Sequence, residues 1–362
     1  MGQENPNSIG TDLPRPSWCD SKNPTLRLLG PGSMTLQEEE IPSPAPGEVL
    51  LRVTAVGICG SDLHWWEEGG IGESKLERPL VLGHEFAGHV ETGRLAGARV
   101  AVEPSIHCAV CDLCRRGHPN LCKSVRFAGH GEIDGALRRW IAWPESLLFP
   151  LPDNVSDAAG AMLEPLGVAL HTLDLAHFRL GESAAVIGCG PIGLMILQLL
   201  RRAGASWIAA TDRLPHRVEA ARKYGADFCS PATKGEEVES ILRQRSAGVD
   251  VVFEAAGDRQ ALEASVEIAA TGGRVLVAGI PPDDQICFPA AVSRRKGLTV
   301  KLVRRMKHTY PRATWLVSSG LVEVESLISH RFSLEEYDKA FAAATRREGL
   351  KVLLEPWRAP GG

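Results

Sequence analysis

The feature that most limits the fold of this chain is a glycine-rich turn between an apolar strand and an apolar-faced helix. The segment SAAVIGCGPIGLMILQLLRRAGA holds the pattern Gly-x-Gly-x-x-Gly at 188–193. Such glycines allow a tight turn and a close approach to a pyrophosphate, which the helix N-terminus then binds. An acidic residue ends the next expected strand, as a dinucleotide-binding βαβ unit requires. The candidate cofactor-binding residues are Gly188, Gly190, Pro191, Ile192, Gly193, Asp212, Arg213 and Arg217.

The acidic residue bears on the choice of dinucleotide. A carboxylate at this point accepts hydrogen bonds from the adenosine ribose and repels a 2′-phosphate, so Asp212 favours NAD. Arg213 and Arg217 keep NADP open, because a nearby arginine can pair with that phosphate. An arginine beside such a site is more often a solvated surface charge or a face on which the adenine stacks. We expect NAD as the cofactor and NADP as the less favoured choice.

Strand and helix patterns divide the chain. From about Ser156 onward, strands such as WIAATD and GVDVVFEAAG alternate with helical segments such as PHRVEAARKYG and QALEASVEIAA. That alternation predicts an α/β fold with a doubly wound parallel sheet. From about Thr25 to Leu151, short apolar runs lie between glycines and prolines, which predicts a separate, strand-rich, barrel-like domain. Residues 1–20 are polar and rich in proline, and we expect a loose extension there.

Four of the nine cysteines lie within fifteen residues, at Cys108, Cys111, Cys114 and Cys122. The N-terminal residues lack a basic segment followed by an apolar stretch, so no secretory signal is expected and the thiols should stay reduced. Four thiolates at this spacing predict the closed, tetrahedral site of a structural zinc. The alternative is four buried thiols that meet in a loop without a metal.

A second set of metal donors lies upstream, with Cys59 in GICGSDLH and His84 and Glu85 in GHE. A catalytic zinc has about three protein ligands and one open position, and these residues offer sulfur, nitrogen and oxygen donors. Alone, a cysteine is usually a small buried hydrophobe, and a His–Glu pair is often a surface feature. Their presence beside a dinucleotide unit favours a catalytic metal.

The composition argues against several other classes of protein. Lysine and arginine number 40 and aspartate and glutamate 44, so the net charge of −4 gives no general attraction to nucleic acid or to an anionic membrane. No apolar run reaches the ~18 residues of a membrane helix. We therefore expect a cytoplasmic protein with neither nucleic-acid nor membrane partners.

Taken together, the motifs resemble those of the zinc-dependent medium-chain dehydrogenase/reductase family, and most of all its polyol branch of sorbitol, xylitol and L-arabinitol dehydrogenases. The likeness runs from about residue 25 to 355. It implies a GroES-like catalytic domain at 21–155 and 301–362, interrupted by a Rossmann NAD-binding domain at 156–300. It also implies a homo-oligomer, a tetramer or a dimer. The motifs that carry it are Cys59-Gly60-Ser61-Asp62-Leu63-His64, the GHE of 83–85, the four-cysteine segment, Glu164-Pro165 and GCGPIG.

The resemblance implies roles for single residues. Cys59, His84 and Glu85 match the catalytic zinc ligands. Glu164 matches an acidic residue that, in the polyol branch, approaches the zinc directly or through water, where alcohol dehydrogenases proper have cysteine. Asp62 matches the carboxylate that orients the histidine ligand.

Four more matches concern catalysis and substrate. Ser61 and His64 match the hydroxyl and imidazole of the family's proton relay, while Trp65 and Arg305 match substrate-side positions. Tyrosine is common where this chain has Trp65. The usual Arg-Tyr-x-Asn-Thr-x-Pro pattern here has methionine at 306 and histidine at 308. These departures leave the particular polyol open.

The implied reaction is NAD-dependent oxidation of a secondary alcohol of a polyol to a ketose, with one catalytic and one structural zinc per chain. Ser61, His64 and Glu164 are the expected catalytic residues. L-Threonine, 2,3-butanediol or a simple alcohol are alternative substrates within the family. A non-catalytic NAD(P)-binding zinc protein is disfavoured, because it would not need the open-site ligands.

Overall fold

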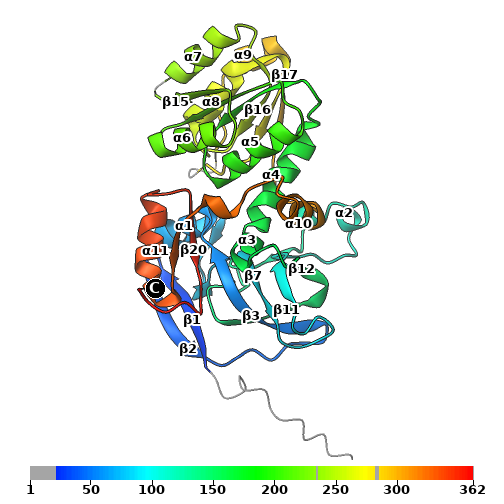
Figure 1. The fold of residues 1–362 in the computed structure, drawn as a ribbon, viewed down its shortest axis with the longest axis vertical. Coiled ribbons are helices and arrows are strands. Elements are labelled where there is room, and N and C mark those ends of the chain that lie inside the picture. The colour runs from blue at the N-terminus through cyan, green and yellow to red at the C-terminus, as the bar shows by residue number, and fades with distance from the viewer. Residues whose placement is uncertain (1–21, 234, 282–284, 362) are drawn as a thin grey trace, which may run out of the picture.

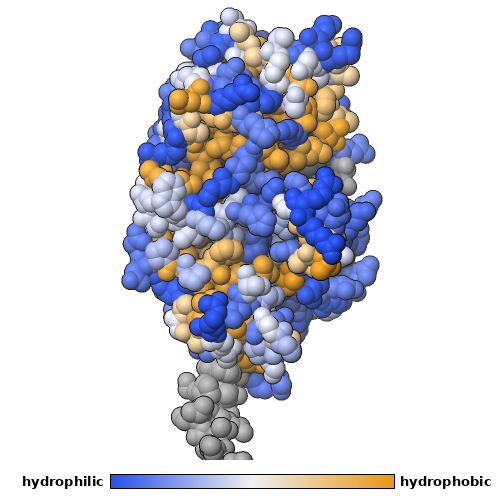
Figure 2. All heavy atoms as spheres, turned by 90° about the vertical axis from the view of Figure 1, so that its right-hand side faces the viewer, coloured by the Kyte–Doolittle hydropathy of each residue, from blue (hydrophilic) through white to orange (hydrophobic). Residues whose placement is uncertain are grey.

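The computed structural model describes residues 22–233, 235–281 and 285–361, so the extension expected at 1–20 lies outside the described residues. Figure 1 shows two parts stacked along the long axis, a sheet with helices on both faces above and a strand-rich part below. Within the described residues, no helix is long and apolar enough to cross a membrane. Seen from the side, the surface is mixed, with apolar residues gathered mainly over the upper part (Figure 2).

The upper part contains a six-stranded sheet whose neighbouring strands are all parallel, in the order β15-β14-β13-β16-β17-β18. After β13, the strands β14 and β15 are added on one side of it. The chain then crosses to the other side of β13 and adds β16, β17 and β18. The direction of winding therefore changes between β13 and β16, and ligands bind outside the carboxyl ends of the strands at such a point. The predicted doubly wound sheet is confirmed. Its elements are β13 (Ser183–Ile187), α5 (Pro191–Arg202), β14 (Trp207–Asp212), α6 (Pro215–Lys223), β15 (Phe228–Pro231), α7 (Glu236–Gln244), β16 (Val249–Glu254), α8 (Arg259–Ile268), β17 (Ala269–Val277), α9 (Ala290–Lys296) and β18 (Thr299–Leu302).

Helix α5 shows why the sequence folds in this way. Its apolar face, including Leu194 and Leu197, packs in one core cluster with Ala184 and Val186 of β13. All five residues of β13 are buried, as expected for a central parallel strand covered on both faces. Pro191 occupies the first turn of α5, where its missing N–H costs no hydrogen bond.

The lower part is built around a seven-stranded sheet in the order β12-β8-β7-β3-β20-β19, with β11 also paired to β3. Smaller sheets join β1, β2 and β6, then β4 and β5, then β9 and β10. This is the expected GroES-like domain. Its strands are β1 (Asn23–Gly30), β2 (Ser33–Glu39), β3 (Glu48–Gly57), β4 (Gly70–Ile71), β5 (Ser74–Lys75), β6 (Leu80–Val81), β7 (Glu85–Val90), β8 (Arg99–Val102), β9 (Ser105–Ile106), β10 (Arg126–Phe127), β11 (Trp140–Pro144), β12 (Leu148–Pro150), β19 (Ile328–Phe332) and β20 (Lys351–Leu354).

Helices lie at the junction between the two parts, and the C-terminal strands return to the sheet of the lower part (Figure 1). Strand β20 pairs with β3 through Leu353 and Gly57, and Gly57 in turn pairs with Glu85 of β7. A segment near the C-terminus therefore lies beside residues nearly three hundred positions earlier. The remaining α-helices are α1 (Gly60–Glu68), α2 (Asp112–Arg115), α3 (Asp157–Ala161), α4 (Leu163–Ala176), α10 (Tyr310–Ser318) and α11 (Tyr337–Thr345).

Candidate active site

A cleft of about 620 Å³ is lined by residues of both parts. The lower part contributes residues of α1 and β20, and the upper part contributes the glycine turn and the loops after β14 and β16. The cleft therefore opens at the point where the winding of the parallel sheet changes direction. Its lining includes Cys59, Ser61, His64, Glu85 and Lys351 from below and Gly188, Gly190, Pro191, Ile192, Asp212, Arg213 and Arg217 from above.

Two glycines of the turn are required by its geometry. Gly188 has φ of +95°, and a Cβ there would lie 2.6 Å from the backbone nitrogen of Ala256. A Cβ on Gly193 would lie only 1.9 Å from the carbonyl oxygen of Gly188. The turn thus brings strand, helix and the β16 loop together more closely than any side chain permits. Gly190 precedes α5 as its N-cap, so the unpaired N–H groups of the first turn are presented at the cleft.

Asp212 lines the cleft at the end of β14, as predicted. Its carboxylate also accepts two backbone hydrogen bonds, from the N–H of Cys189 at 2.8 Å and from the N–H of Leu214 at 2.8 Å. The side chain therefore holds the glycine turn against the next strand. Each carboxylate oxygen has further lone pairs for another donor, so this role is compatible with binding ribose hydroxyls.

The two neighbouring arginines behave differently. Arg213 donates to Gln260 at 2.9 Å and lies 3.2 Å from Asp258, so its charge is already paired. Arg217 stands beside the glycine turn, and its buried Nε has no hydrogen-bond partner among the described residues. Burial lowers the pKa of Arg217, although Asp212 partly offsets the effect. Of the two, Arg217 is the one still able to contact a further group in the cleft.

The predicted catalytic metal donors come together in space. Ligand atoms of Cys59, His84 and Glu85 all lie within 4.8 Å of one another. Cys59 is the N-cap of α1, and His84 and Glu85 lead into β7, so a helix start and a strand start converge. One thiol, one imidazole and one carboxylate at this separation fit zinc, which binds such donors at about 2.0–2.3 Å. The set faces the cleft through Cys59 and Glu85, which leaves a side open to a substrate.

Asp62 organises this donor set. Its carboxylate accepts hydrogen bonds from the N–H of Cys59 at 2.9 Å and of Gly83 at 3.2 Å, and it lies 3.5 Å from Nδ1 of His84. Burial would raise the pKa of Asp62, but the His84 imidazole and the two backbone donors outweigh burial and hold the pKa below its usual value. Asp62 thus caps α1 and also orients His84, whose Nε2 lies 3.5 Å from the hydroxyl of Ser61.

Sequence patterns did not reveal the partner of Glu85. Its carboxylate forms an ion pair with Lys351 of β20, and the two side chains are only 1% and 4% exposed. A Cβ on Gly57, between them, would lie 2.1 Å from Glu85 Oε2 and 2.9 Å from Lys351 Cε, so only glycine leaves room for the pair. The lysine stands in an ordinary apolar strand, KVLL, and only the pairing of β20 with β3 shows its role.

Two more acids with shifted pKa values, the buried Glu164 and the half-buried Glu103, lie outside the donor set. Burial raises the pKa of Glu164 to about 8, although His84 offsets part of the rise. Glu164 does not belong to the group of three donors within 4.8 Å, so its approach to a metal remains a prediction. Glu103 was missed by the sequence analysis, and burial raises its pKa to about 7. Its place directly after the buried strand β8 was the available signal.

The expected substrate-side residues occupy different settings. The guanidinium of Arg305 lies 4.0 Å from the centre of the Phe127 ring, and its buried Nη1 has no hydrogen-bond partner among the described residues. Burial lowers the pKa of Arg305 to about 10, with a further contribution from Arg304. Trp65 is 1% exposed and packs edge-on against His130, with ring centres 5.3 Å apart. Arg305 thus has an unpaired donor and Trp65 fills the core, and neither residue is among those that line the cleft.

The two departures from the polyol pattern also lie outside the cleft lining. Met306 is buried against α4, where a Cβ on Gly167 would come within 2.4 Å of its sulfur. His308 is exposed and has φ of +51°. Neither residue lines the cleft described above. Packing on Gly167 gives a physical reason for the methionine.

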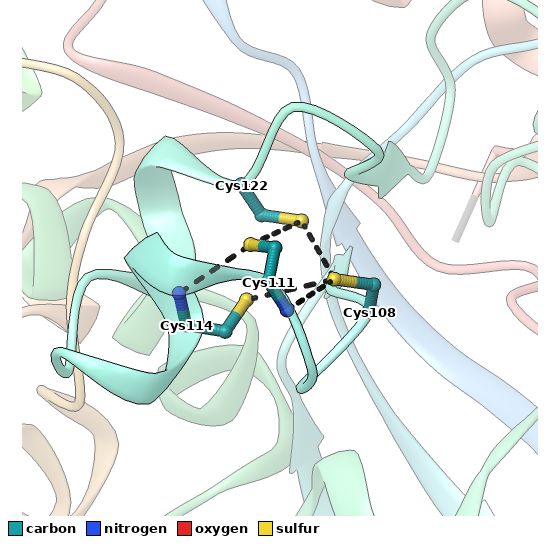
Figure 3. A group of neighbouring side chains, drawn as sticks. All are labelled: Cys108, Cys111, Cys114 and Cys122. Atoms are coloured by element: carbon teal, nitrogen blue, oxygen red, sulfur yellow. Dashed lines mark hydrogen bonds between the residues drawn. The ribbon is translucent and has the colours of Figure 1, made fainter.

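The four-cysteine segment forms a separate cluster, with all four side chains pointing toward one another (Figure 3). The sulfur atoms of three pairs lie 3.6, 3.9 and 4.0 Å apart. A tetrahedral zinc with bonds of about 2.3 Å would place its sulfurs about 3.8 Å apart, so the cluster fits that ion. None of the four lines the cleft, which agrees with a structural role. The residues are Cys108, Cys111, Cys114 and Cys122.

Backbone N–H groups favour the thiolate form at Cys108, whereas burial and the neighbouring thiols raise the pKa of Cys114 to about 12. The N–H of Cys111 donates to the sulfur of Cys108 at 3.3 Å, and the N–H of Cys114 donates to the sulfur of Cys111 at 3.5 Å. Donation from the N–H groups of Val110 and Cys111 lowers the pKa of Cys108 to about 6. A thiolate is the form that binds a metal.

This chain combines a GroES-like domain with a Rossmann sheet, and a metal donor set lies in the cleft that the two domains line. These features together define a zinc-dependent dehydrogenase. Residues 45–153 match the alcohol dehydrogenase GroES-like domain, and residues 191–319 match the zinc-binding dehydrogenase family. The chain belongs to this family of zinc-dependent dehydrogenases and is an oxidoreductase.

Individual relatives are similar over nearly the whole chain. Sorbitol dehydrogenase of Bacillus subtilis is 35% identical over 322 residues, covering 86% of this chain and 91% of the relative. The Aspergillus fumigatus protein named "Probable D-xylulose reductase A" is 34% identical, covering 93% and 98%. A structure from Sinorhizobium meliloti 1021, described as a zinc-binding dehydrogenase bound to NADP, is 32% identical with a TM-score of 0.85, covering 93% and 100%.

Proposed function

We propose that this enzyme oxidises a secondary alcohol of a polyol to the corresponding ketose, with NAD as the hydride acceptor. One observation carries the proposal. The cleft is lined on one side by the metal donors Cys59 and Glu85 and on the other by the glycine turn and Asp212. An alcohol at the metal donors and a dinucleotide at the glycine turn would therefore lie in the same cleft.

We infer two zinc ions per chain, one held by Cys59, His84 and Glu85 and one by the four-cysteine cluster. When bound, the catalytic zinc supplies Lewis acidity that lowers the pKa of an alcohol, and NAD supplies the site that accepts hydride. The preference for NAD rests on the buried carboxylate of Asp212 and on the pairing of Arg213 with Asp258. Arg217 is the residue through which NADP could bind instead.

The chain's own side chains would then position the substrate and move its proton. Asp62 holds His84, and Lys351 holds Glu85, so two of the three donors are oriented by buried partners. The hydroxyl of Ser61 lies beside His84 and is placed to accept the substrate proton. His64 lines the same cleft and would take this proton toward solvent.

Glu164 is a further acid that we assign to the catalytic metal site. Its carboxyl has a pKa of about 8 because of burial, so it is mostly protonated at neutral pH while His84 and Glu85 lie nearby. A cation in the donor set would favour its ionised form. We assign Glu164 to the coordination of the metal, directly or through water.

The polyol class is inferred from the relatives named above, and Arg305 offers an unpaired donor for a substrate hydroxyl. We further propose a homo-oligomer, a tetramer or a dimer, located in the cytoplasm, and domain limits at 21–155 with 301–362 and at 156–300. The end strand β18 of the parallel sheet exposes Leu302, which supports an association between subunits.

A metal and activity measurement on matched cysteine variants tests the function. Cys59→Ser should retain one zinc per chain, bind NAD and lose turnover on sorbitol, xylitol and arabinitol. Cys287→Ser, which changes an exposed cysteine away from both metal groups, should keep two zincs and full activity. Turnover in a Cys59→Ser protein verified to lack the second zinc would refute the assignment. If the rates on L-threonine or 2,3-butanediol exceed those on every polyol, the polyol assignment is wrong and the alternative substrate class is correct.

A further inference from the structure

One face of α1 carries a chain of proton-handling groups. Ser61, His64 and Glu68 are three and four positions apart, a spacing that places side chains on one side of a helix. All three line the cleft. The metal donor Cys59 is the N-cap of the helix and Gly69 is its C-cap, so this face leads from the donor set to the far end of the helix.

His64 and Glu68 contact each other directly. Nδ1 of His64 lies 3.1 Å from Oε1 of Glu68. An ionised carboxylate only accepts hydrogen bonds, so Nδ1 must carry the proton of this bond, and Nε2 is left as the acceptor of the neutral ring. The contact thus selects the tautomer in which His64 can receive a proton.

Burial along this face increases toward the donor set. The side chain of Glu68 is 47% exposed and that of His64 is 20% exposed, so the carboxylate stands on the solvent side of the ring. The other charged groups of the lower part that line this cleft are Glu67, Glu85, Arg347 and Lys351. Lys351 is paired with Glu85, and Glu68 is the acid that contacts His64.

We propose that Glu68 is a positioning residue that holds His64 in the Nδ1–H tautomer and stabilises the imidazolium formed when Nε2 takes the substrate proton. The proton then leaves the ring to solvent water, and no electrons move in this step. The inference rests on the proposed function, because it concerns the proton that alcohol oxidation releases. It adds a residue to the relay that the motif Cys59–His64 does not contain.

The test compares Glu68→Ala, Glu68→Gln and Glu67→Ala in the zinc-loaded enzyme. Ring-labelled histidine is observed by 15N NMR, and the signals of His64 are assigned by their loss in His64→Asn. Glu68→Ala should move His64 toward the Nε2–H tautomer and lower kcat by about two- to tenfold, with KM for NAD changed less than twofold. Glu68→Gln, whose amide oxygen still accepts from Nδ1–H, should restore the tautomer and most of the rate.

Glu67→Ala is the matched control, because it removes a carboxylate that lines the same cleft from the same helix. It should leave the His64 tautomer unchanged. Unchanged His64 signals and kcat in Glu68→Ala, or equal effects in Glu67→Ala, would overturn the proposal. A wild-type enzyme that turns over no alcohol would instead overturn the proposed function, and the NMR comparison would still decide whether Glu68 sets the tautomer.

Discussion

The buried ion pair between Glu85 and Lys351 supports a quantitative prediction about stability. Lys351→Met keeps a side chain of similar length but removes the positive charge. Both partners are almost fully buried, and Oε2 of Glu85 has no other polar partner among the described residues. Removing one member of such a pair leaves an uncompensated buried charge, which costs about 3–5 kcal/mol. We expect the metal-free protein to lose free energy of unfolding in this range.

The double variant Glu85→Leu/Lys351→Met separates the effect of an unpaired charge from the effect of losing the pair. With both charged groups replaced by apolar ones, the loss should fall to about 1 kcal/mol or less, because replacing a whole buried pair by hydrophobic residues of similar volume is often nearly neutral. Lys339→Met is the control for an exposed pair. Lys339 is 70% exposed and contacts Glu336 at 3.0 Å, so its loss should cost less than about 1 kcal/mol.

Equilibrium urea unfolding, followed by circular dichroism and tryptophan fluorescence in the presence of a chelator, measures these differences. A repeat with excess zinc tests the origin of the effect. Zinc would supply positive charge beside Glu85, so it should reduce the loss caused by Lys351→Met. A loss below about 1 kcal/mol in chelator, or one that the double variant shares in full, would refute the reasoning.

Three further predictions concern other parts of the molecule. Cys111→Ser should lower the zinc content by one ion per chain and lower Tm, while Cys287→Ser should change neither, as measured by metal analysis and calorimetry. Asp212→Ala should raise KM for NAD about tenfold or more and KM for NADP less, because it removes a charged acceptor and two backbone contacts; an unchanged ratio of the two KM values would exclude Asp212 as the ribose ligand. Burial raises the pKa of Glu103 to about 7, above the value near 4.3 of an unfolded chain, so the protonated form is the one that folding favours. Wild-type stability should therefore fall relative to Glu103→Gln as the pH rises from about 4 through 7, and parallel Tm profiles of the two proteins would contradict this.

Local sequence patterns predicted the glycine turn and the four-cysteine cluster, because the residues of each lie close together in the chain. Within the turn at 188–193, position 193 requires glycine because a Cβ there would collide with the carbonyl oxygen of Gly188, a few positions earlier. The cysteines of the four-cysteine cluster lie within fifteen residues of sequence, so their spacing alone predicted a cluster, and their sulfur atoms do lie close together. In both cases a short stretch of sequence contains most of the atoms that make the site.

The tertiary structure decided contacts between distant segments. Lys351 reaches Glu85 only because β20 pairs with β3 after the chain has completed the cofactor domain, and no local pattern records that pairing. Burial is also a property of the whole fold. It raises the pKa of Glu103, and it places Trp65 in the core although its motif suggested a substrate contact. Sequence motifs therefore indicated the candidate metal and dinucleotide sites, because such sites depend on the type and spacing of donors. The electrostatic partners of these residues depended on packing between strands far apart in the chain.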